Sequence, residues 1–268
     1  MDRQQHIKLA LSEDQYKKDI TTKILQLDKE CKAIIKAKES FHIYGLKWFS
    51  DVFKSVNKST KIKLKVKDGD LVKKNKIIAE IYGANHALLN SERVALNYLQ
   101  TMSGTYDKCI RFRKKISNKK IQLLHTRKTI PLYRLPLSEA CKAAGCHPHR
   151  YDLSSSILIK ENHLKLVSKS LDLITKAIKQ HKIVIVEAKT LKFAEMVSNL
   201  KISRILLDNF TPAMIKSFIS SKPKIKIEVS GSVNLNNINK FSIKGVHYIS
   251  VGDLTKNIES KDLSMLIV

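Results

Sequence analysis

Short apolar runs recur through the second half of the chain. They begin at residues 121, 156, 183, 202, 225 and 246, and most are followed by a segment with apolar residues at helical spacing. Near-continuous apolar runs that alternate with helices are typical of parallel strands covered on both faces. Six regularly spaced units within about 140 residues favour a βα barrel over an open sheet.

The first hundred residues show a different pattern. Lys alternates with Ile, Leu and Val in 61–72 (KIKLKVKDGDLV), which predicts a strand with one buried and one lysine-covered face. Asp-Gly-Asp at 68–70 is typical of a turn, and 73–83 (KKNKIIAEIYG) is expected to return as the partner strand. Apolar residues at helical spacing predict a helix from about residue 85 to Met102, ended by Ser-Gly-Thr. This region is therefore expected to be an α+β unit.

Polar and charged side chains follow each of the six apolar runs. In a βα barrel, the loops at the carboxyl ends of the strands build the active site. The residues expected to converge there are Arg127, Lys128, Lys160, Glu187, Asp208, Ser230, Gly231 and Gly252, joined by His149 and Arg150 from the His-Pro-His-Arg segment between the first two runs.

This set predicts a site for anions. Packing four cations beside His149 is costly without an anionic ligand, so the pocket should bind several negative charges. Glu187 and Asp208, on neighbouring strand ends, predict a site for Mg²⁺ shared with phosphate oxygens. Ser-Gly-Ser at 230–232, where a strand is expected to turn into a helix, predicts a phosphate site made of backbone N–H groups and the helix dipole. The expected ligands are a phosphorylated sugar with a metal and a small polyacid.

The charge of the chain supports small anionic partners. The formal net charge is +26, from 50 Lys and Arg against 24 Asp and Glu, and only 8 of the cations are Arg. The Lys residues are spread along the whole chain, and no zinc-finger spacing, aromatic stacking pair or Arg-rich arm indicates nucleic-acid binding. Six of the 8 Arg fall between Arg93 and Arg150, where the planar guanidinium fork suits carboxylates and phosphates.

The sequence also predicts a compartment. No apolar run has the length of a membrane span, and the first residues lack the uninterrupted apolar stretch of a secretory leader. Four Cys are too few and too scattered for a disulfide scaffold. A reduced, cytoplasmic location with no membrane partner is therefore expected.

Eight motifs, in order, resemble quinolinate phosphoribosyltransferase, the decarboxylating nicotinate-nucleotide pyrophosphorylase. They cover roughly nine-tenths of the chain and are EDQYKKDITT (13–22), SERVALNYLQTMSG (91–104), HTRKTIP (125–131), HRYDLSSSILIKENH (149–163), VEAKT (186–190), LLDNF (206–210), EVSGS (228–232) and ISVGDLT (249–255). The resemblance implies an α/β fold in which an incomplete parallel α/β barrel, residues 108–256, follows an N-terminal α/β sandwich. The sandwich is expected to comprise 1–107, joined by the C-terminal segment 257–268.

The same resemblance implies the reaction and its partners. Quinolinate and phosphoribosyl pyrophosphate, with Mg²⁺, would give nicotinate mononucleotide, pyrophosphate and CO₂ in NAD biosynthesis. The chain would work as a homodimer or as a hexamer, a trimer of dimers, in which Arg93 completes the site of the neighbouring subunit.

Individual roles also follow from the resemblance. Four of the residues would surround the quinolinate carboxylates, and these are Arg127, His149, Arg150 and Lys160. Lys128 would lie near the reacting phosphates, and Glu187 and Asp208 would face the ribose and the magnesium pyrophosphate. Lys128, Lys160, Glu187 and Asp208 are the expected catalytic residues. The loops that would hold the substrates' phosphates and ribose add Thr126, Ser230, Gly231, Ser232, Val251, Gly252 and Asp253.

Several positions depart from the family pattern, most of them beside the expected quinolinate pocket. Cys146 and Pro148 stand where Gly and Asn are usual, and Ile130 and Leu132 where Thr and Gly are usual. Two alternatives therefore stay open: a related phosphoribosyltransferase acting on another aromatic acid, and a non-catalytic basic protein that binds nucleic acid.

Two further sets of residues carry alternative interpretations. The Cys-x4-Cys-His-x-His spacing from Cys141 to His149 does not match common zinc sites, which disfavours a structural metal there. Glu228 either points into the site beside Ser230 or supports one of the cations from behind, and the second interpretation is favoured.

Overall fold

A computed structural model describes residues 1–24, 29–168, 170–181 and 183–268. The chain divides into two compact units. The first contains Met1–Cys109, Ile130–Ala144 and Ile258–Val268, and the second contains Ile110–Thr129 and Gly145–Asn257. The first unit thus includes Ile130–Ala144, a segment that the sequence-based division assigned to the barrel.

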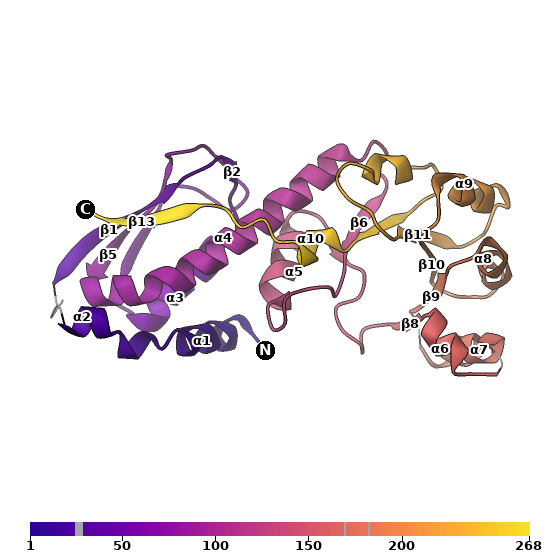
Figure 1. Ribbon diagram of the computed structural model, residues 1–268, viewed down its shortest axis with the longest axis horizontal. Helices are drawn as coiled ribbons and strands as arrows, with labels where there is room; N and C mark the ends of the chain where they lie inside the picture. Colours follow the sequence, from indigo (N-terminus) through magenta and orange to yellow (C-terminus); the bar gives the residue numbers. More distant parts are fainter. Residues whose placement is uncertain (25–28, 169, 182) are drawn as a thin grey trace. The chain divides into compact units, whose positions relative to one another are not determined.

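The first unit is built on a four-stranded antiparallel sheet in the order β13-β1-β5-β3. Its strands are β1 (Glu30–Ala37), β3 (Lys61–Leu64), β5 (Ile77–Ala84) and β13 (Leu263–Ile267). The last strand of the chain, β13, runs beside β1, the first strand (Figure 1). The pairing of Lys61 with Tyr82 confirms the predicted hairpin partners, although β3 ends at Leu64. The short strand β4 (Leu71–Val72) instead pairs with β2 (Phe41–His42).

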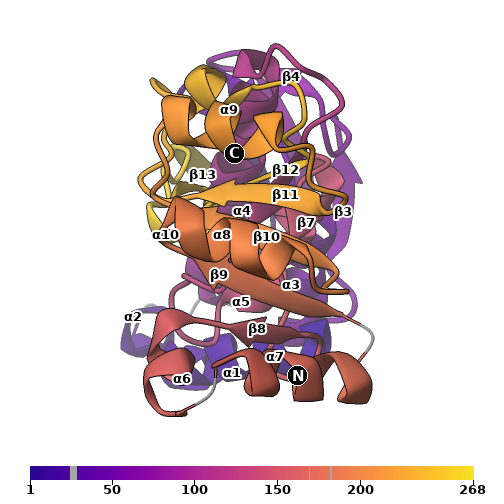
Figure 2. The same cartoon turned by 90° about the vertical axis from the view of Figure 1, so that its right-hand side faces the viewer.

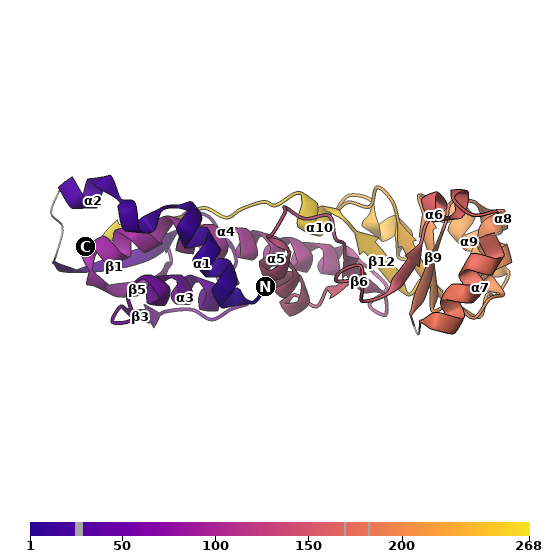
Figure 3. The same cartoon turned by 90° about the horizontal axis from the view of Figure 1, so that it is seen from below.

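Helices cover this sheet and enclose the apolar core of the unit. They are α1 (Arg3–Glu13), α2 (Ile20–Ile24), α3 (Leu46–Val56), α4 (Asn85–Lys115) and α5 (Arg134–Ala143), with a 3-10 turn η1 (Tyr16–Lys18). Helix α1 packs on α3 (Figure 3). Trp48, Phe49 and Phe53 of α3 are at most 1% exposed, and they pack with Ile35 of the sheet and Leu99 of α4 in one buried cluster.

The helix predicted to end at Ser-Gly-Thr is longer than expected. Helix α4 continues through Gly104 to Lys115. A Cβ atom on Gly104 would lie 2.0 Å from the backbone O of Glu259, so the glycine permits close backbone approach and does not end the helix. Ser103 is fully buried in the same turn, and its hydroxyl donates to the backbone O of Tyr44. A helix stop was therefore the wrong interpretation of this sequence.

The second unit is a seven-stranded, entirely parallel sheet in the order β7-β6-β12-β11-β10-β9-β8. The six predicted runs form β6 (Gln122–His125), β8 (Ile157–Ile159), β9 (Val184–Ala188), β10 (Arg204–Asp208), β11 (Lys226–Ser230) and β12 (Tyr248–Val251). The seventh strand, β7 (His147–Pro148), was not predicted. Within the described ranges no ladder joins β7 to β8, so the barrel stays incomplete, as expected.

Helices alternate with these strands and lie outside the sheet. They are α6 (Glu161–Lys165), α7 (Ser170–Gln180), α8 (Leu191–Ser198), α9 (Pro212–Ser220) and α10 (Asp253–Lys256), with a 3-10 turn η2 (Ile238–Phe241). Figure 2 shows α8 in front of the sheet, where it packs on β9 and β10, and α9 packs beside α8. Thr190 and Thr211 cap α8 and α9, because each hydroxyl accepts a hydrogen bond from a free N–H of the first turn.

No helix in the described part of the chain is long and apolar enough to cross a membrane.

Candidate active site

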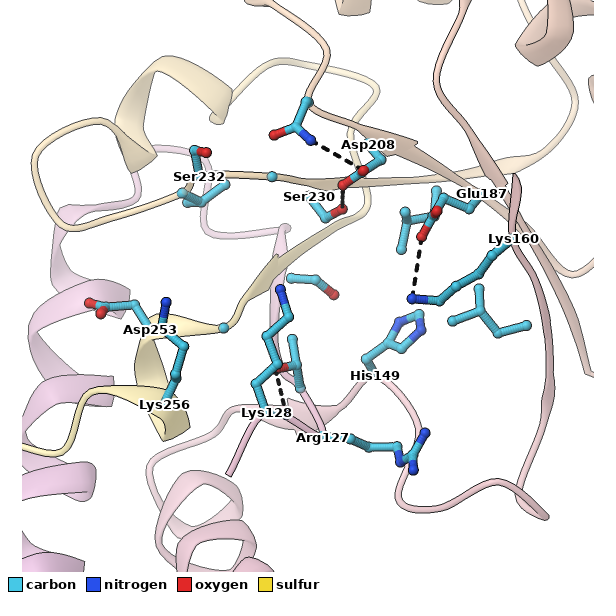
Figure 4. Close-up of a pocket in the computed structure, with 18 of the residues that line it drawn as sticks. Arg127, Lys128, His149, Lys160, Glu187, Asp208, Ser230, Ser232, Asp253 and Lys256 are labelled. Atoms are coloured by element: carbon cyan, nitrogen blue, oxygen red, sulfur yellow. Dashed lines mark hydrogen bonds and ion pairs between the residues drawn. The ribbon is translucent and has the colours of Figure 1, made fainter. Parts of the chain in front are cut away.

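A cleft of about 860 Å³ opens at the carboxyl ends of the parallel strands of the second unit. This volume lies within the range of about 300–1,000 Å³ that is typical of small-molecule binding sites. Thirteen of the predicted site residues line it, and these are Thr126, Arg127, Lys128, His149, Arg150, Lys160, Glu187, Asp208, Ser230, Gly231, Ser232, Gly252 and Asp253. Figure 4 shows most of them pointing into one space.

Two predicted residues do not line the cleft. Val251 is buried in β12, so only its backbone neighbours the loop that begins at Gly252. Arg93 lies in the first unit, exposed on α4, where it lines a separate hollow with Leu9 and Ile130. The role of Arg93 at the site of a neighbouring subunit stays a prediction.

One side of the cleft is a cationic wall formed by Arg127, Arg150 and Lys160. The Nε atoms of Arg127 and Arg150 are buried, and neither has a hydrogen-bond partner among the described residues. Burial lowers the pKa of the Arg150 guanidinium, and the charge of Arg127 lowers it further. Two arginines that repel each other in this way favour an anionic ligand between them.

Two carboxylates also line the cleft, one of them beside Lys160. Glu187 at the end of β9 lies 3.6 Å from the Lys160 Nζ, and the Ser230 hydroxyl donates to Asp208 Oδ1 at 2.8 Å. The Asn209 amide donates to Asp208 Oδ2 at 3.2 Å, so hydroxyl and amide groups orient this carboxylate. Carboxylates with neighbouring hydroxyl and amide oxygens are the donor set of a hard divalent cation. No group of three His, Cys, Asp or Glu that could hold a metal exists among the residues with assigned positions. A metal at the two carboxylates would therefore need ligands from the substrate or from water.

The loop after β11 has the backbone geometry of an anion cradle. Gly231 has φ +99° and Ser232 has φ +49°, both in the left-handed region. Successive residues of this kind turn their N–H groups toward one side, where a phosphate can bind. The prediction of a helix after this turn was wrong, because the chain continues as an Asn-rich loop to the short turn η2. Asn side chains of this loop bond the nearby backbone, as when Asn237 donates to the Ser232 carbonyl, and this competes with helix formation.

Hydrogen bonds fix the backbone of Lys128 beside the loop that begins at Gly252. Its backbone N–H donates to the Thr126 hydroxyl, and its carbonyl accepts a bond from the Thr255 hydroxyl at 2.9 Å. A Cβ atom on Gly252 would lie 3.3 Å from Lys128 Cδ, so the glycine leaves room for the lysine stem. The fixed backbone and the glycine together let the Lys128 ammonium reach into the cleft.

Glu228 supports the site from behind, as predicted. It is fully buried and lies 2.8 Å from His149 Nδ1 and 2.8 Å from Arg204 Nε. The prediction did not include Arg204, whose guanidinium also donates to the His149 carbonyl at 2.7 Å.

Sequence reasoning also missed two lysines that line the cleft, Lys189 and Lys256. Lys189 follows Glu187 at a spacing of two, so the period of a strand placed both on one side. Lys256 lies one helical turn after Gly252, which is the corresponding signal for a helix. Lys189 is also paired with Glu161, and this pair is the main reason that its pKa is raised.

Comparisons with known proteins agree with this geometry. The family model for the N-terminal domain of quinolinate phosphoribosyl transferase matches residues 19–103, and the model for the C-terminal domain matches residues 107–266. The chain belongs to the quinolinate phosphoribosyltransferase family. Both models together cover the antiparallel sheet and the incomplete parallel barrel.

Family members of named activity are similar over nearly the whole chain. A probable nicotinate-nucleotide pyrophosphorylase of Bacillus subtilis is 32% identical over 251 residues, which is 92% of this chain and 87% of that protein. A quinolinate phosphoribosyltransferase of Nicotiana tabacum is 32% identical over 97% of this chain and 81% of its own length.

Solved structures of the family have the same fold. A nicotinate-nucleotide pyrophosphorylase from Ehrlichia chaffeensis superposes with a TM-score of 0.94 at 29% identity, covering 100% of this chain and 99% of that one. The enzyme of the same name from Francisella tularensis gives a TM-score of 0.90 at 32% identity, over 99% of this chain and 97% of that one.

Proposed function

We propose that the protein transfers the phosphoribosyl group of phosphoribosyl pyrophosphate to quinolinate with loss of CO₂, giving nicotinate mononucleotide and pyrophosphate for NAD biosynthesis. One observation carries the proposal. A single cleft is lined by two arginines whose buried Nε atoms have no hydrogen-bond partner among the described residues, by a pair of carboxylates and by a left-handed glycine loop. Quinolinate supplies two adjacent carboxylates for the cationic wall, and the sugar phosphate supplies anions for the loop. Family membership supports the same chemistry.

The transfer step needs positioning more than acid–base chemistry. The quinolinate ring nitrogen forms a bond to the ribose C1 atom, and the bond from C1 to the pyrophosphate oxygen breaks with its electron pair. Positive character develops at C1, and the carboxylates of Glu187 and Asp208, which line the cleft, can stabilise it. The cationic wall, by neutralising the ring carboxylates, permits two anions to approach each other.

The decarboxylation step follows from the first. The ring nitrogen is now quaternary, so the carbon next to it can keep the electron pair when its bond to the carboxylate breaks. CO₂ leaves, and a proton from solvent replaces it on the ring. The protein's part is to hold the ring while the charge moves, and no general base is required for either bond.

Magnesium is proposed as the cofactor. Glu187 and Asp208 would hold it, and the Ser230 hydroxyl that orients Asp208 supports that assignment. When bound, Mg²⁺ neutralises charge on the departing pyrophosphate.

The remaining assignments concern assembly and location. Arg93, exposed on α4, is proposed to enter the site of a neighbouring subunit in a dimer or in a trimer of dimers. No disulfide joins the four cysteines, all of which lie within the described residues, and this supports the reduced cytoplasm proposed as the location of the protein.

A direct assay tests the function. Purified protein is incubated with quinolinate, phosphoribosyl pyrophosphate and Mg²⁺, and CO₂ and nicotinate mononucleotide are measured. Equimolar release of both products is expected, and Asp208→Asn should lower kcat by about 100-fold or more. Nicotinic acid in place of quinolinate is the matched substrate control, because it lacks the carboxylate that is lost. Turnover of a different aromatic acid alone, or none together with salt-sensitive RNA binding, would refute the proposal.

A further inference from the structure

A buried network lies behind the cationic wall. Glu228 Oε1 is 2.8 Å from His149 Nδ1, and Oε2 is 2.8 Å from Arg204 Nε. The Ser250 hydroxyl also donates to Oε1, and the Arg204 guanidinium carbon lies 5.1 Å from the centroid of the Tyr248 ring. Glu228 is fully buried, so these contacts replace water around its carboxylate. We call these five residues the Glu228 network.

The network determines where the His149 ring carries its hydrogen. An ionised carboxylate only accepts hydrogen bonds, so Nδ1 must donate to Glu228. The Arg204 guanidinium is another donor, and its hydrogen bond goes to the His149 carbonyl at 2.7 Å in preference to Nδ1 at 3.1 Å. The other ring nitrogen, Nε2, is buried and has no hydrogen-bond partner among the described residues, and His149 lines the cleft (Figure 4). In the neutral ring, Nε2 therefore offers a lone pair to the ligand.

We propose that Glu228 is a positioning residue that makes His149 take up a proton when the anionic substrate binds. The inference rests on the proposed function, because the ligand is taken to be a dicarboxylate. A lone pair on Nε2 would repel a carboxylate, whereas an N–H there donates a charge-assisted hydrogen bond. The proton comes from solvent and adds to Nε2, and no bond of the substrate forms or breaks in this step.

The charges that face His149 decide when the proton is held. Behind the ring, Glu228 is ion-paired with Arg204 through Oε2, and its other carboxylate oxygen lies against His149 Nδ1. Six cations line the cleft side (Arg127, Lys128, Arg150, Lys160, Lys189 and Lys256), against three carboxylates (Glu187, Asp208 and Asp253). This excess of positive charge opposes a further positive charge on His149 in the empty cleft. A bound dicarboxylate offsets the excess, and the Glu228 carboxylate then stabilises the imidazolium through Nδ1. Binding and protonation are therefore coupled.

Calorimetry measures this coupling directly. Quinolinate is titrated into the whole protein at pH 8 in buffers that differ in ionisation enthalpy, and the slope gives the protons taken up per site. About one proton is expected for the unmodified protein. In Glu228→Gln the amide oxygen still accepts from Nδ1, but the charge is lost. Proton uptake should then fall to near zero, and quinolinate should bind about tenfold or more weakly.

Two further variants control the experiment. Glu228→Gln leaves Arg204 as an uncompensated buried charge, so the double variant Glu228→Gln/Arg204→Leu tests the same point without that destabilising group. Ser250→Ala removes a hydroxyl from the same carboxylate oxygen, keeps the charge, and should take up a proton as the unmodified protein does.

The outcomes separate the two proposals. Undiminished proton uptake in both Gln variants overturns the role of Glu228, and so does equal loss of uptake in Ser250→Ala. If the unmodified protein neither binds quinolinate nor forms nicotinate mononucleotide, the proposed function itself fails.

Discussion

Replacing Gly231 with alanine tests whether the loop after β11 is the phosphate cradle. Its φ of +99° is a conformation that side chains other than glycine rarely adopt. An added Cβ would lie 2.1 Å from Asn209 Oδ1 and 2.6 Å from the Asn209 backbone N. The side chain can rotate away, but the backbone atom cannot move alone, because its N–H donates to the Ser230 carbonyl at 2.9 Å.

The size of the effect follows from these contacts. A left-handed conformation costs an alanine about 1–2 kcal/mol, and losing one backbone hydrogen bond costs about 1 kcal/mol. The local cost is therefore about 3 kcal/mol, which corresponds to about a 100-fold loss of affinity if the loop must regain its shape to bind phosphate. Quinolinate binds on the cationic wall in this scheme, so its affinity should change by less than about threefold.

The assay compares binding of both substrates and unfolding by urea. Gly252→Ala is the matched control, because Gly252 lines the same cleft with φ −66°. Its added Cβ would lie 3.3 Å from the flexible Lys128 stem and 3.7 Å from the Thr126 hydroxyl, the latter an ordinary van der Waals contact. Its free energy of unfolding should change by less than about 0.5 kcal/mol. Phosphoribosyl pyrophosphate binding by Gly231→Ala at the level of the unmodified protein would refute the cradle, and so would an equal loss of quinolinate affinity.

Three further changes test other parts of the structure. Arg93→Ala should abolish turnover. Mixing this variant with inactive Lys160→Ala should restore activity, because each hybrid dimer then has one intact shared site. If activity does not recover although subunit exchange is proven, Arg93 does not act in the neighbouring subunit. Asp208→Asn should raise the Mg²⁺ concentration for half-maximal rate by about tenfold or more, which a magnesium titration at saturating substrates measures, and an unchanged titration argues against metal binding there. Gly104→Ala should lower the free energy of unfolding by about 2 kcal/mol, although alanine has the better helix propensity. The control Lys114→Ala, at an exposed position of the same helix, should be nearly neutral. Urea unfolding of both variants measures these changes, and a Gly104→Ala protein that is more stable than the unmodified one contradicts the prediction.

The sequence pattern predicts those strands whose formation depends on their own apolar residues. Each of the six apolar runs is buried from both sides of a parallel sheet, so apolar character alone marks them. Strand β7 has only His147 and Pro148 and no apolar pattern. It could not be predicted locally, because it forms only through pairing with the neighbouring strand β6. Gly104 was misinterpreted for a similar reason: the residue that it accommodates, Glu259, is distant in sequence.

The site shows the same division. Residues directly after a strand were predicted, since the end of a strand identifies the edge on which they lie. Arg204 was missed because it is the first residue of β10, and the length of its side chain carries the guanidinium to His149. The supporting role of Glu228 was predicted, because Glu228 lies within the apolar run of β11, two residues before Ser230, but its partner Arg204 was not.

Because no strand pairing joins β7 to β8 among the described residues, the bound substrate is expected to hold these two edges of the barrel together. His149 and Arg150 follow one edge strand and Lys160 follows the other. A long hydrogen bond from Arg150 to the Ser156 carbonyl, at 3.5 Å, joins these two segments. The width of the pocket can therefore change without breaking a strand ladder. A dicarboxylate held by residues from both edges closes the ring that the backbone leaves open, so substrate occupancy should slow amide hydrogen exchange at both edge strands together.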